Sequence, residues 1–201
     1  MILVGRNSSP FVRRVAISLR LLGLPFEQKL LSTIANREEV LALNPLGRIP
    51  ALVLEGGETL IDSSAILDHL DELAGPDKAL VPPSGADRRR VLKLVALGTG
   101  AMEKLLSCYV ERNIRPLDKQ HQDLLERFAA QAMAGLQALE EQCGDGWLFG
   151  GKITQADVTT VAALGFVEPA MPGLLPPGRL PKLQALRARA ETLPAFADSK
   201  V

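Results

Sequence analysis

Residues 49–61 carry the local signal that most restricts how this 201-residue chain can fold. The largely apolar run at 49–55 predicts a strand, and Gly56-Gly57 predicts the two-residue turn of a hairpin. Residues 58–61 then predict the partner strand. The pattern therefore requires an antiparallel pair of strands in this part of the chain.

The rest of the first 75 residues alternates strand and helix signals before and after this hairpin. The signals run in order through a strand at 2–4, a helix from Pro10 to a stop at Gly23, a strand at 26–31, a short helix from 36 to 43, the hairpin, and a helix that begins at Asp62 or Ser63 and ends at Gly75. The order β-α-β-α-β-β-α gives two parallel strands and an antiparallel hairpin, covered by helices. It predicts an α/β domain over residues 1–75.

The remainder of the chain carries helix signals alone. Residues 76–85 are rich in proline and predict a linker between domains. Beyond them, helical periodicity covers four stretches: 91–109, 125–139, 154–166 and 181–193. Gly98 and Gly100 lower the helix propensity of the first stretch, whereas the third is apolar on nearly every side. We therefore predict an all-α domain over residues 86–201.

The composition argues against several classes of partner. Lysine and arginine together number 23, as do aspartate and glutamate, so the formal net charge is zero and no overall field favours nucleic acid or an anionic membrane. No apolar run approaches the roughly 18 residues of a membrane span. Cys108 and Cys143 form no CxxC pair and are typical of reduced thiols. We expect a cytoplasmic protein that binds no metal, nucleic acid or membrane.

The first candidate site is Asn7-Ser8-Ser9-Pro10-Phe11, between the first strand and the first helix. The free N–H groups and positive end of that helix favour a thiolate, and a serine hydroxyl there can donate a hydrogen bond to sulfur. Lowering a thiol pKa of ~8.5 by about two units requires about 2.7 kcal/mol. One charge-assisted hydrogen bond and a helix terminus can supply that stabilisation. The alternative is that Ser8 or Ser9 only caps the helix.

The second candidate site is Arg48-Ile49-Pro50, at the start of the hairpin. A proline at the second position of a strand donates no hydrogen bond to the sheet. A cis Ile49–Pro50 peptide bond would turn the Ile49 backbone outward, where it can pair with an extended peptide ligand. The alternative is an ordinary trans proline at the start of a strand.

The third candidate site is Asp62-Ser63, at the junction of a strand and a helix. The N–H and hydroxyl of Ser63 can hold a carboxylate at the helix N-terminus, and Asp62 can pair with an ammonium group. A plain helix cap is the alternative. Taken together, the three sites describe a slot for a tripeptide that carries a free α-amino acid at one end and a thiol.

Four motifs make the chain resemble the cytosolic glutathione transferases, in particular the bacterial serine-type or omega-like members, over essentially its whole length. They are Ser-Pro-Phe-x-x-Arg at 9–14, Asn-Pro-Leu-Gly-Arg-Ile-Pro-Ala-Leu at 44–52, Leu-Ile-Asp-Ser-Ser-Ala-Ile at 60–66, and Gly151 with Thr-Gln-Ala-Asp at 154–157. In order, they resemble the active-site turn, the signature loop, the γ-glutamyl motif and the capping box of the helical domain. The resemblance implies a thioredoxin-like domain followed by an all-helical domain.

The resemblance also implies a role for each site residue. Ser9 would face the glutathione sulfur, and Ile49 would pair with the cysteinyl backbone beside a cis Pro50. The γ-glutamyl end would lie at Asp62 and Ser63. The remaining expected contacts with glutathione are Phe11 and Arg48.

This sequence departs from the family pattern at two of these positions. Arg48 stands where lysine is usual and Asp62 where glutamate is commoner, and both changes keep the charge. Glutaredoxin-like members carry cysteine at position 9. Ser9 argues against thiol–disulfide exchange, because serine forms no mixed disulfide.

An electrophile pocket is expected on the long helix of the second domain. Met102, Leu106, Tyr109 and Arg112 follow one another at i, i+4, i+7 and i+10, which places them on one helix face. Tyr109 can polarise an acceptor. The alternative for Met102 and Leu106 is ordinary helix packing.

The resemblance implies an enzyme that uses glutathione as co-substrate. The thiolate would attack a small electrophile in a detoxification reaction, and the enzyme would be a homodimer. One alternative is a non-catalytic interaction or regulatory protein of the same fold. The other is a glutathione-dependent reductase or peroxidase.

Overall fold

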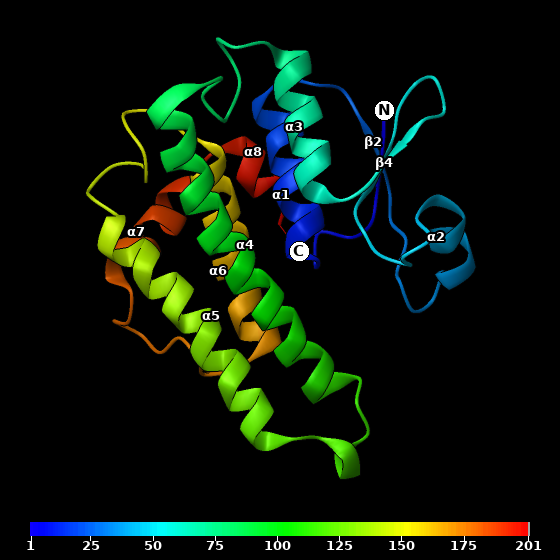
Figure 1. Cartoon of the computed structure of the whole chain (residues 1–201), viewed down its shortest axis with the longest axis vertical. Coiled ribbons are helices and arrows are strands. Elements are labelled where there is room, and N and C mark those ends of the chain that lie inside the picture. The colour runs from blue at the N-terminus through cyan, green and yellow to red at the C-terminus, as the bar shows by residue number, and fades with distance from the viewer. Residues whose placement is uncertain (201) are drawn as a thin grey trace. The chain divides into compact units, whose positions relative to one another are not determined.

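Four short strands near the N-terminus form one mixed sheet in the computed structural model, which describes residues 1–200 (Figure 1). The strands are β1 (Ile2–Val4), β2 (Glu27–Lys29), β3 (Ala51–Val53) and β4 (Thr59–Leu60), and their order across the sheet is β2-β1-β3-β4. β1 pairs with β2 in parallel and with β3 in antiparallel fashion, and β3 pairs antiparallel with β4. The predicted parallel pair and hairpin are both confirmed.

Three helices cover this sheet: α1 (Pro10–Leu21), α2 (Arg37–Leu43) and α3 (Ser63–Ala74). α1 packs against α3 and β1, and α3 also packs against β3. Val40 of α2 lies in a separate buried cluster with Val4 and Ala51. Because successive strand residues face opposite sides of a sheet, Val4 can join this cluster while Leu3 faces the other side. The β-α-β-α-β-β-α order expected from the sequence is thus the observed one.

Residues 84–190 form a second unit, in which the regular secondary structure is entirely helical. Its helices are α4 (Gly85–Asn113), the short 3₁₀ helix η1 (Leu117–Lys119), α5 (Gln122–Gln142), α6 (Gln155–Ala170) and α7 (Pro181–Ala190). α4 packs along α5 and against α6 (Figure 1). α6 is buried along nearly its whole length, as its apolar sequence predicts.

Two glycines permit close approach between these helices. α4 continues through Gly98, where a Cβ would lie only 3.0 Å from the Thr159 side chain of α6. On α5, a Cβ at Gly135 would lie 3.2 Å from the Leu97 carbonyl oxygen. The low helix propensity of Gly98 is therefore offset by packing that a larger residue would disturb.

The N-terminus of α6 carries the predicted capping box. Thr154 and Asp157 exchange hydrogen bonds, with the Thr154 N–H 2.8 Å from Asp157 Oδ2. The Leu148 N–H also donates to Asp157, over 2.7 Å. Asp157 has no exposed surface, and burial raises the pKa of its carboxyl group, although hydrogen bonds from Leu148 and Thr154 oppose the shift. The motif therefore fixes both the helix start and the preceding loop.

The chain divides into two units whose boundaries differ from the linear division expected from periodicity. The first unit is Met1–Pro83 together with the segment that begins at Glu191, and the second is Ser84–Ala190. α8 (Pro194–Ala197) packs against α1, and Phe196 is fully buried. Residues 191–200 therefore belong with the sheet, and not with the helices that precede them. No helix among residues 1–200 is long and apolar enough to cross a membrane.

Candidate functional site

A pocket of about 240 Å³ opens in the first unit, at the ends of several elements. It is lined by Phe11, Asn44, Leu46, Arg48, Ile49, Pro50, Ile61, Asp62 and Ser63. These residues come from the start of α1, the loop between α2 and β3, and the junction of β4 with α3. Two of the three candidate sites predicted from the sequence therefore line one pocket, together with Phe11.

The loop between α2 and β3 is braced by Asn44. The buried Asn44 side chain donates to the Arg48 carbonyl oxygen over 2.9 Å and accepts from the Leu46 N–H over 3.0 Å. Gly47 has a positive φ of 63°, and its N–H donates to the Asn44 carbonyl oxygen over 2.8 Å. This tight turn positions Arg48 and Ile49 at the pocket. Asn44 is the first residue of the motif at 44–52, but the sequence did not indicate that its side chain braces the turn.

The Ile49–Pro50 peptide bond is cis, as the sequence predicted. Ile49 and Pro50 both line the pocket. Ala51, the next residue, begins β3 and pairs with Val4 of β1. The central strands of the sheet thus hold this segment in place.

The junction of β4 and α3 presents polar groups at a helix N-terminus. Asp62 is the N-cap of α3, and its Oδ1 accepts from the Ser64 N–H over 2.9 Å. Asp62 is exposed, whereas Ser63 beside it is buried. The helix cap that was considered as an alternative is present, and the same two residues line the pocket.

A buried arginine stands behind Ser63. Arg14 has no exposed surface, and its Nε and Nη2 lie 3.1 and 2.8 Å from Ser63 Oγ. Nη2 also donates to Ser64 Oγ over 3.0 Å. A serine hydroxyl has two acceptor positions and one donor. Because guanidinium N–H groups occupy both acceptor positions of Ser63, its O–H is left to donate to another group.

Ser9 is the N-cap of α1, and its hydroxyl makes only a weak capping contact. Ser9 Oγ lies 3.5 Å from the Val12 N–H, at the long limit of a hydrogen bond. Ser9 is half-buried, whereas Ser8 is exposed. Ser9 is absent from the pocket lining, although Phe11 of the same turn is part of it. Its predicted contact with sulfur stays a prediction.

The turn that carries Ser9 is fixed by close contacts. Gln28 Nε2 donates to the Gly5 carbonyl oxygen over 2.9 Å and to Asn7 Oδ1 over 2.8 Å. Gly5 has a φ of 128°, and a Cβ there would lie 2.5 Å from Val12 Cγ2. Only glycine fits this position without displacement of its neighbours. No local sequence motif indicated the role of Gln28.

The residues predicted for the electrophile pocket have different environments along α4. Met102 is fully buried, which favours the packing alternative for this residue. Leu106 and Tyr109 are half-buried, and the Tyr109 ring lies 5.8 Å from the Phe166 ring. Arg112 is exposed. Their role toward an electrophile stays a prediction.

Both cysteines are buried. Burial raises the pKa of the Cys108 thiol and of the Cys143 thiol. Neither is therefore poised as a thiolate nucleophile. Among residues 1–200, no three His, Cys, Asp or Glu side chains converge in a way that could hold a metal ion.

Two parts of the sequence match the two domains of one protein family. Residues 3–78 match the family described as "Glutathione S-transferase, N-terminal domain", and residues 122–189 match "Glutathione S-transferase, C-terminal domain". The chain belongs to the glutathione S-transferase family. This membership agrees with the observed succession of a four-stranded mixed sheet and a helical unit.

Relatives of this glutathione S-transferase family member include proteins of different names. The GST-like protein YibF of Escherichia coli is 33% identical over 170 residues, which cover 84% of this chain and 82% of the relative. A maleylacetoacetate isomerase of Pseudomonas aeruginosa is 33% identical over 169 residues, which cover 81% and 78% of the two chains.

Solved structures of the family superpose closely on this chain. A glutathione S-transferase of Methylobacterium radiotolerans in complex with glutathione sulfonate is 30% identical, with a TM-score of 0.90, and 98% of this chain and 93% of that one are covered. A glutathione S-transferase of Methylobacillus flagellatus with glutathione bound is 26% identical, with a TM-score of 0.91, and the coverage is 99% and 98%.

Proposed function

We propose that this protein is a glutathione transferase, which binds glutathione in the pocket of the first unit and uses its thiolate to attack a small electrophile. The observation that carries the proposal is the pocket in which the cis Ile49–Pro50 segment meets Ser63, whose hydroxyl is held by Arg14. Related solved structures that hold glutathione or glutathione sulfonate support the choice of ligand.

Each part of glutathione has a chemically suitable partner in this proposal. The γ-glutamyl carboxylate accepts from the Ser63 hydroxyl and N–H at the start of α3, where the helix dipole also favours an anion. The ammonium group pairs with Asp62. The cysteinyl backbone pairs with Ile49, and Arg48 supplies a cation for the glycine carboxylate. Phe11 supplies apolar surface beside the tripeptide.

The sulfur then lies at the N-terminus of α1. The Ser9 hydroxyl donates to it, and the positive end of the α1 dipole adds positive potential. Stabilisation of about 2.7 kcal/mol would lower the thiol pKa by about two units. The thiol gives its proton to solvent, and a sulfur lone pair forms the new bond to the electrophilic carbon. Electrons of the substrate move onto its leaving group or its acceptor atom.

The related maleylacetoacetate isomerases favour a second candidate function. In that case the same thiolate would add reversibly to a carbon–carbon double bond, and glutathione would be regenerated. Both functions need a stabilised thiolate, and they differ only in the fate of the adduct. Maleylacetoacetate therefore belongs in the substrate panel.

The finer features of the protein are also proposals. Ser9 at the start of α1 supports the serine-type, omega-like assignment. We further propose a cytoplasmic homodimer, with Leu106, Tyr109 and Arg112 near the electrophile. Analytical ultracentrifugation of the purified chain tests the dimer, and a single species with the mass of one chain, 21.6 kDa, would contradict it.

The function is tested with purified protein, glutathione and a panel of electrophiles, hydroperoxides and disulfides. We expect conjugation by the wild type and a loss of about 10- to 100-fold in Ser9→Ala, if the hydroxyl supplies about 1.4–2.8 kcal/mol. Ser9→Cys should lose conjugation and gain thiol transfer through a mixed disulfide with glutathione.

Three results would change this conclusion. Turnover of peroxide or disulfide without conjugation by the wild type would support the reductase or peroxidase alternative. Calorimetry without heat and without competition by S-alkyl glutathione would support an interaction protein. An unchanged rate and pH profile in Ser9→Ala would make Ser9 a helix cap only, and would move the sulfur contact to Ser8, Tyr109 or a backbone N–H.

A further inference from the structure

Two consecutive arginines of α1 are buried and hold different parts of the first unit. Arg14 reaches Ser63 and Ser64 at the start of α3. Arg13, of which only 3% is exposed, instead reaches the segment after α7. Successive residues point about 100° apart around a helix, so the two guanidinium groups serve separate contacts. We call residues 191–200 the strap.

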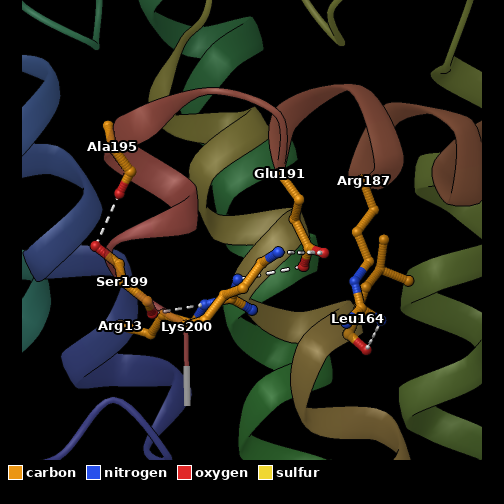
Figure 2. Close-up of polar contacts among 7 residues, drawn as sticks. All are labelled: Arg13, Leu164, Arg187, Glu191, Ala195, Ser199 and Lys200. Carbon is orange, nitrogen blue, oxygen red and sulfur yellow. Dashed lines mark hydrogen bonds and ion pairs between the residues drawn. The ribbon is translucent and has the colours of Figure 1, made fainter.

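The strap is fastened to Arg13 near both of its ends (Figure 2). Arg13 Nη2 lies 3.3 Å from Glu191 Oε1, and Arg13 Nε donates to the Ser199 carbonyl oxygen over 3.2 Å. Lys200 Nζ lies 3.9 Å from the other Glu191 oxygen. Ser199 Oγ donates to the Ala195 carbonyl oxygen over 2.8 Å. One arginine side chain thus closes the strap into a loop.

The strap also has an apolar anchor. Phe196 and Ser199 have no exposed surface, and α8 packs against α1. The Arg13 guanidinium and its contact with the Ser199 carbonyl oxygen are therefore largely shielded from water, whereas the Glu191 side chain is 20% exposed. Charged hydrogen bonds in such surroundings are less screened than surface ion pairs, and the removal of one partner leaves the other uncompensated.

Arg13 is also part of the first turn that carries Ser9. The Arg13 N–H donates to the Ser9 carbonyl oxygen over 2.9 Å, and the Val12 N–H is the one that faces Ser9 Oγ. Helix ends fray, because their outer groups have few partners. An Arg13 side chain fixed by the strap restrains fraying of this turn, and with it the position of Ser9.

We infer that the strap positions the N-terminal turn of α1 for thiolate stabilisation, and that Arg13 is the positioning residue through which it acts. The inference rests on the proposed function, in which Ser9 faces the glutathione sulfur. Arg13 and Glu191 should therefore affect the pKa of the thiol at the sulfur end of the ligand. The γ-glutamyl end, held by Ser63 and Arg14, should be affected little.

The test compares Glu191→Gln and Arg13→Met with the wild type. The pKa of enzyme-bound glutathione is read from thiolate absorbance, and affinity is measured for S-methyl glutathione, which has no ionisable thiol. We expect both variants to raise the bound thiol pKa by about one unit, with affinity for S-methyl glutathione changed less than about twofold. Arg13→Lys keeps the positive charge, so its bound thiol pKa should lie between those of the wild type and Arg13→Met.

Glu39→Gln is the matched control. It breaks an ion pair of the same unit, Lys29 Nζ to Glu39 Oε2 at 3.0 Å, which is exposed and distant in sequence from α1. It should leave the bound thiol pKa and the affinity for S-methyl glutathione unchanged. An unchanged thiol pKa in folded Glu191→Gln and Arg13→Met would overturn the inference. A parallel fall of S-methyl glutathione affinity and of thermal stability would also overturn it, because the strap would then only support the fold.

Hydrogen exchange separates failure of this inference from failure of the proposed function. If the wild type leaves the glutathione thiol pKa at its free value, the proposed function fails, and with it the catalytic meaning of the strap. The structural part of the inference, that the strap restrains the first turn of α1, is still tested by hydrogen exchange at the Arg13 amide. This amide should exchange at least about tenfold faster in Glu191→Gln than in the wild type or in Glu39→Gln. Equal exchange rates would refute that step directly.

Discussion

Replacement of Arg14 by methionine should weaken glutathione binding without unfolding the protein. Arg14 makes two contacts with Ser63 Oγ, at 3.1 and 2.8 Å, and one with Ser64 Oγ, at 3.0 Å. Methionine keeps an apolar stem of similar length but has no donor. Removal of one partner of a buried charged contact costs stability, so the melting temperature should fall, but methionine keeps most of the packing of the arginine stem. The variant therefore removes the orientation of the Ser63 hydroxyl more than it removes packing.

The magnitude follows from the interactions that the ligand loses. With both acceptor positions of Ser63 free, its O–H can turn toward the protein, and the γ-glutamyl carboxylate loses a prearranged donor. The nearby positive charge is lost as well. A hydrogen bond to a charged group contributes about 1.5–3 kcal/mol. Since about 1.4 kcal/mol corresponds to a factor of ten, the dissociation constant should rise about 10- to 100-fold.

Isothermal titration calorimetry with glutathione measures this change, and circular dichroism on heating checks that the variant is folded. The matched control is Arg20→Met on the same helix, because Arg20 lies over the Phe26 ring and donates to the Ala16 carbonyl oxygen. A double-mutant cycle with Ser63→Ala should show strong non-additivity, since both changes remove one interaction. A folded Arg14→Met variant with wild-type affinity would refute the reasoning.

Two further predictions concern the helical unit. Asp157→Ala leaves the buried N–H groups of Leu148 and Thr154 without their acceptor. The free energy of unfolding, measured in urea, should therefore fall by about 2–5 kcal/mol, and a loss below about 0.5 kcal/mol would contradict this prediction. Hydrogen bonding from the His121 N–H holds the pKa of Glu111 below its ordinary value of 4.5. As the pH falls, the Glu111 carboxylate is therefore protonated in the unfolded chain before it is protonated in the folded protein, so stability should fall below about pH 4.5. In thermal melts between about pH 3 and 6, the range of carboxyl titration, Glu111→Gln should make that fall less steep. An unchanged slope would contradict this prediction.

The sequence predicts well those elements of both units whose signals are local. Gly56-Gly57 between two apolar runs is enough to indicate a hairpin. Thr154 and Asp157 at a spacing of three are enough to indicate a capping box, and the structure contains it. The cis Ile49–Pro50 bond differs from these signals, because the residues alone left a trans bond open and the family resemblance favoured the cis form that the structure contains.

The contacts that the sequence does not reveal join residues far apart along the chain. Arg14 meets Ser63 across 49 positions, and Arg13 meets Ser199 across 186. Periodicity describes which face of a helix is apolar, but it does not identify the partner of a buried charge. Met102 shows a second limit of periodicity. Its place on a helix face fits a pocket or a core equally well, and its burial favours packing in the core.

A structure of the protein with glutathione bound tests the central claim most directly. We expect the γ-glutamyl carboxylate within about 2.7–3.2 Å of Ser63 Oγ and N, the cysteinyl backbone paired with Ile49, and the sulfur within hydrogen-bond distance of Ser9 Oγ. Glutathione bound outside the pocket, bound in the reverse direction, or bound with its sulfur away from Ser9 would contradict it.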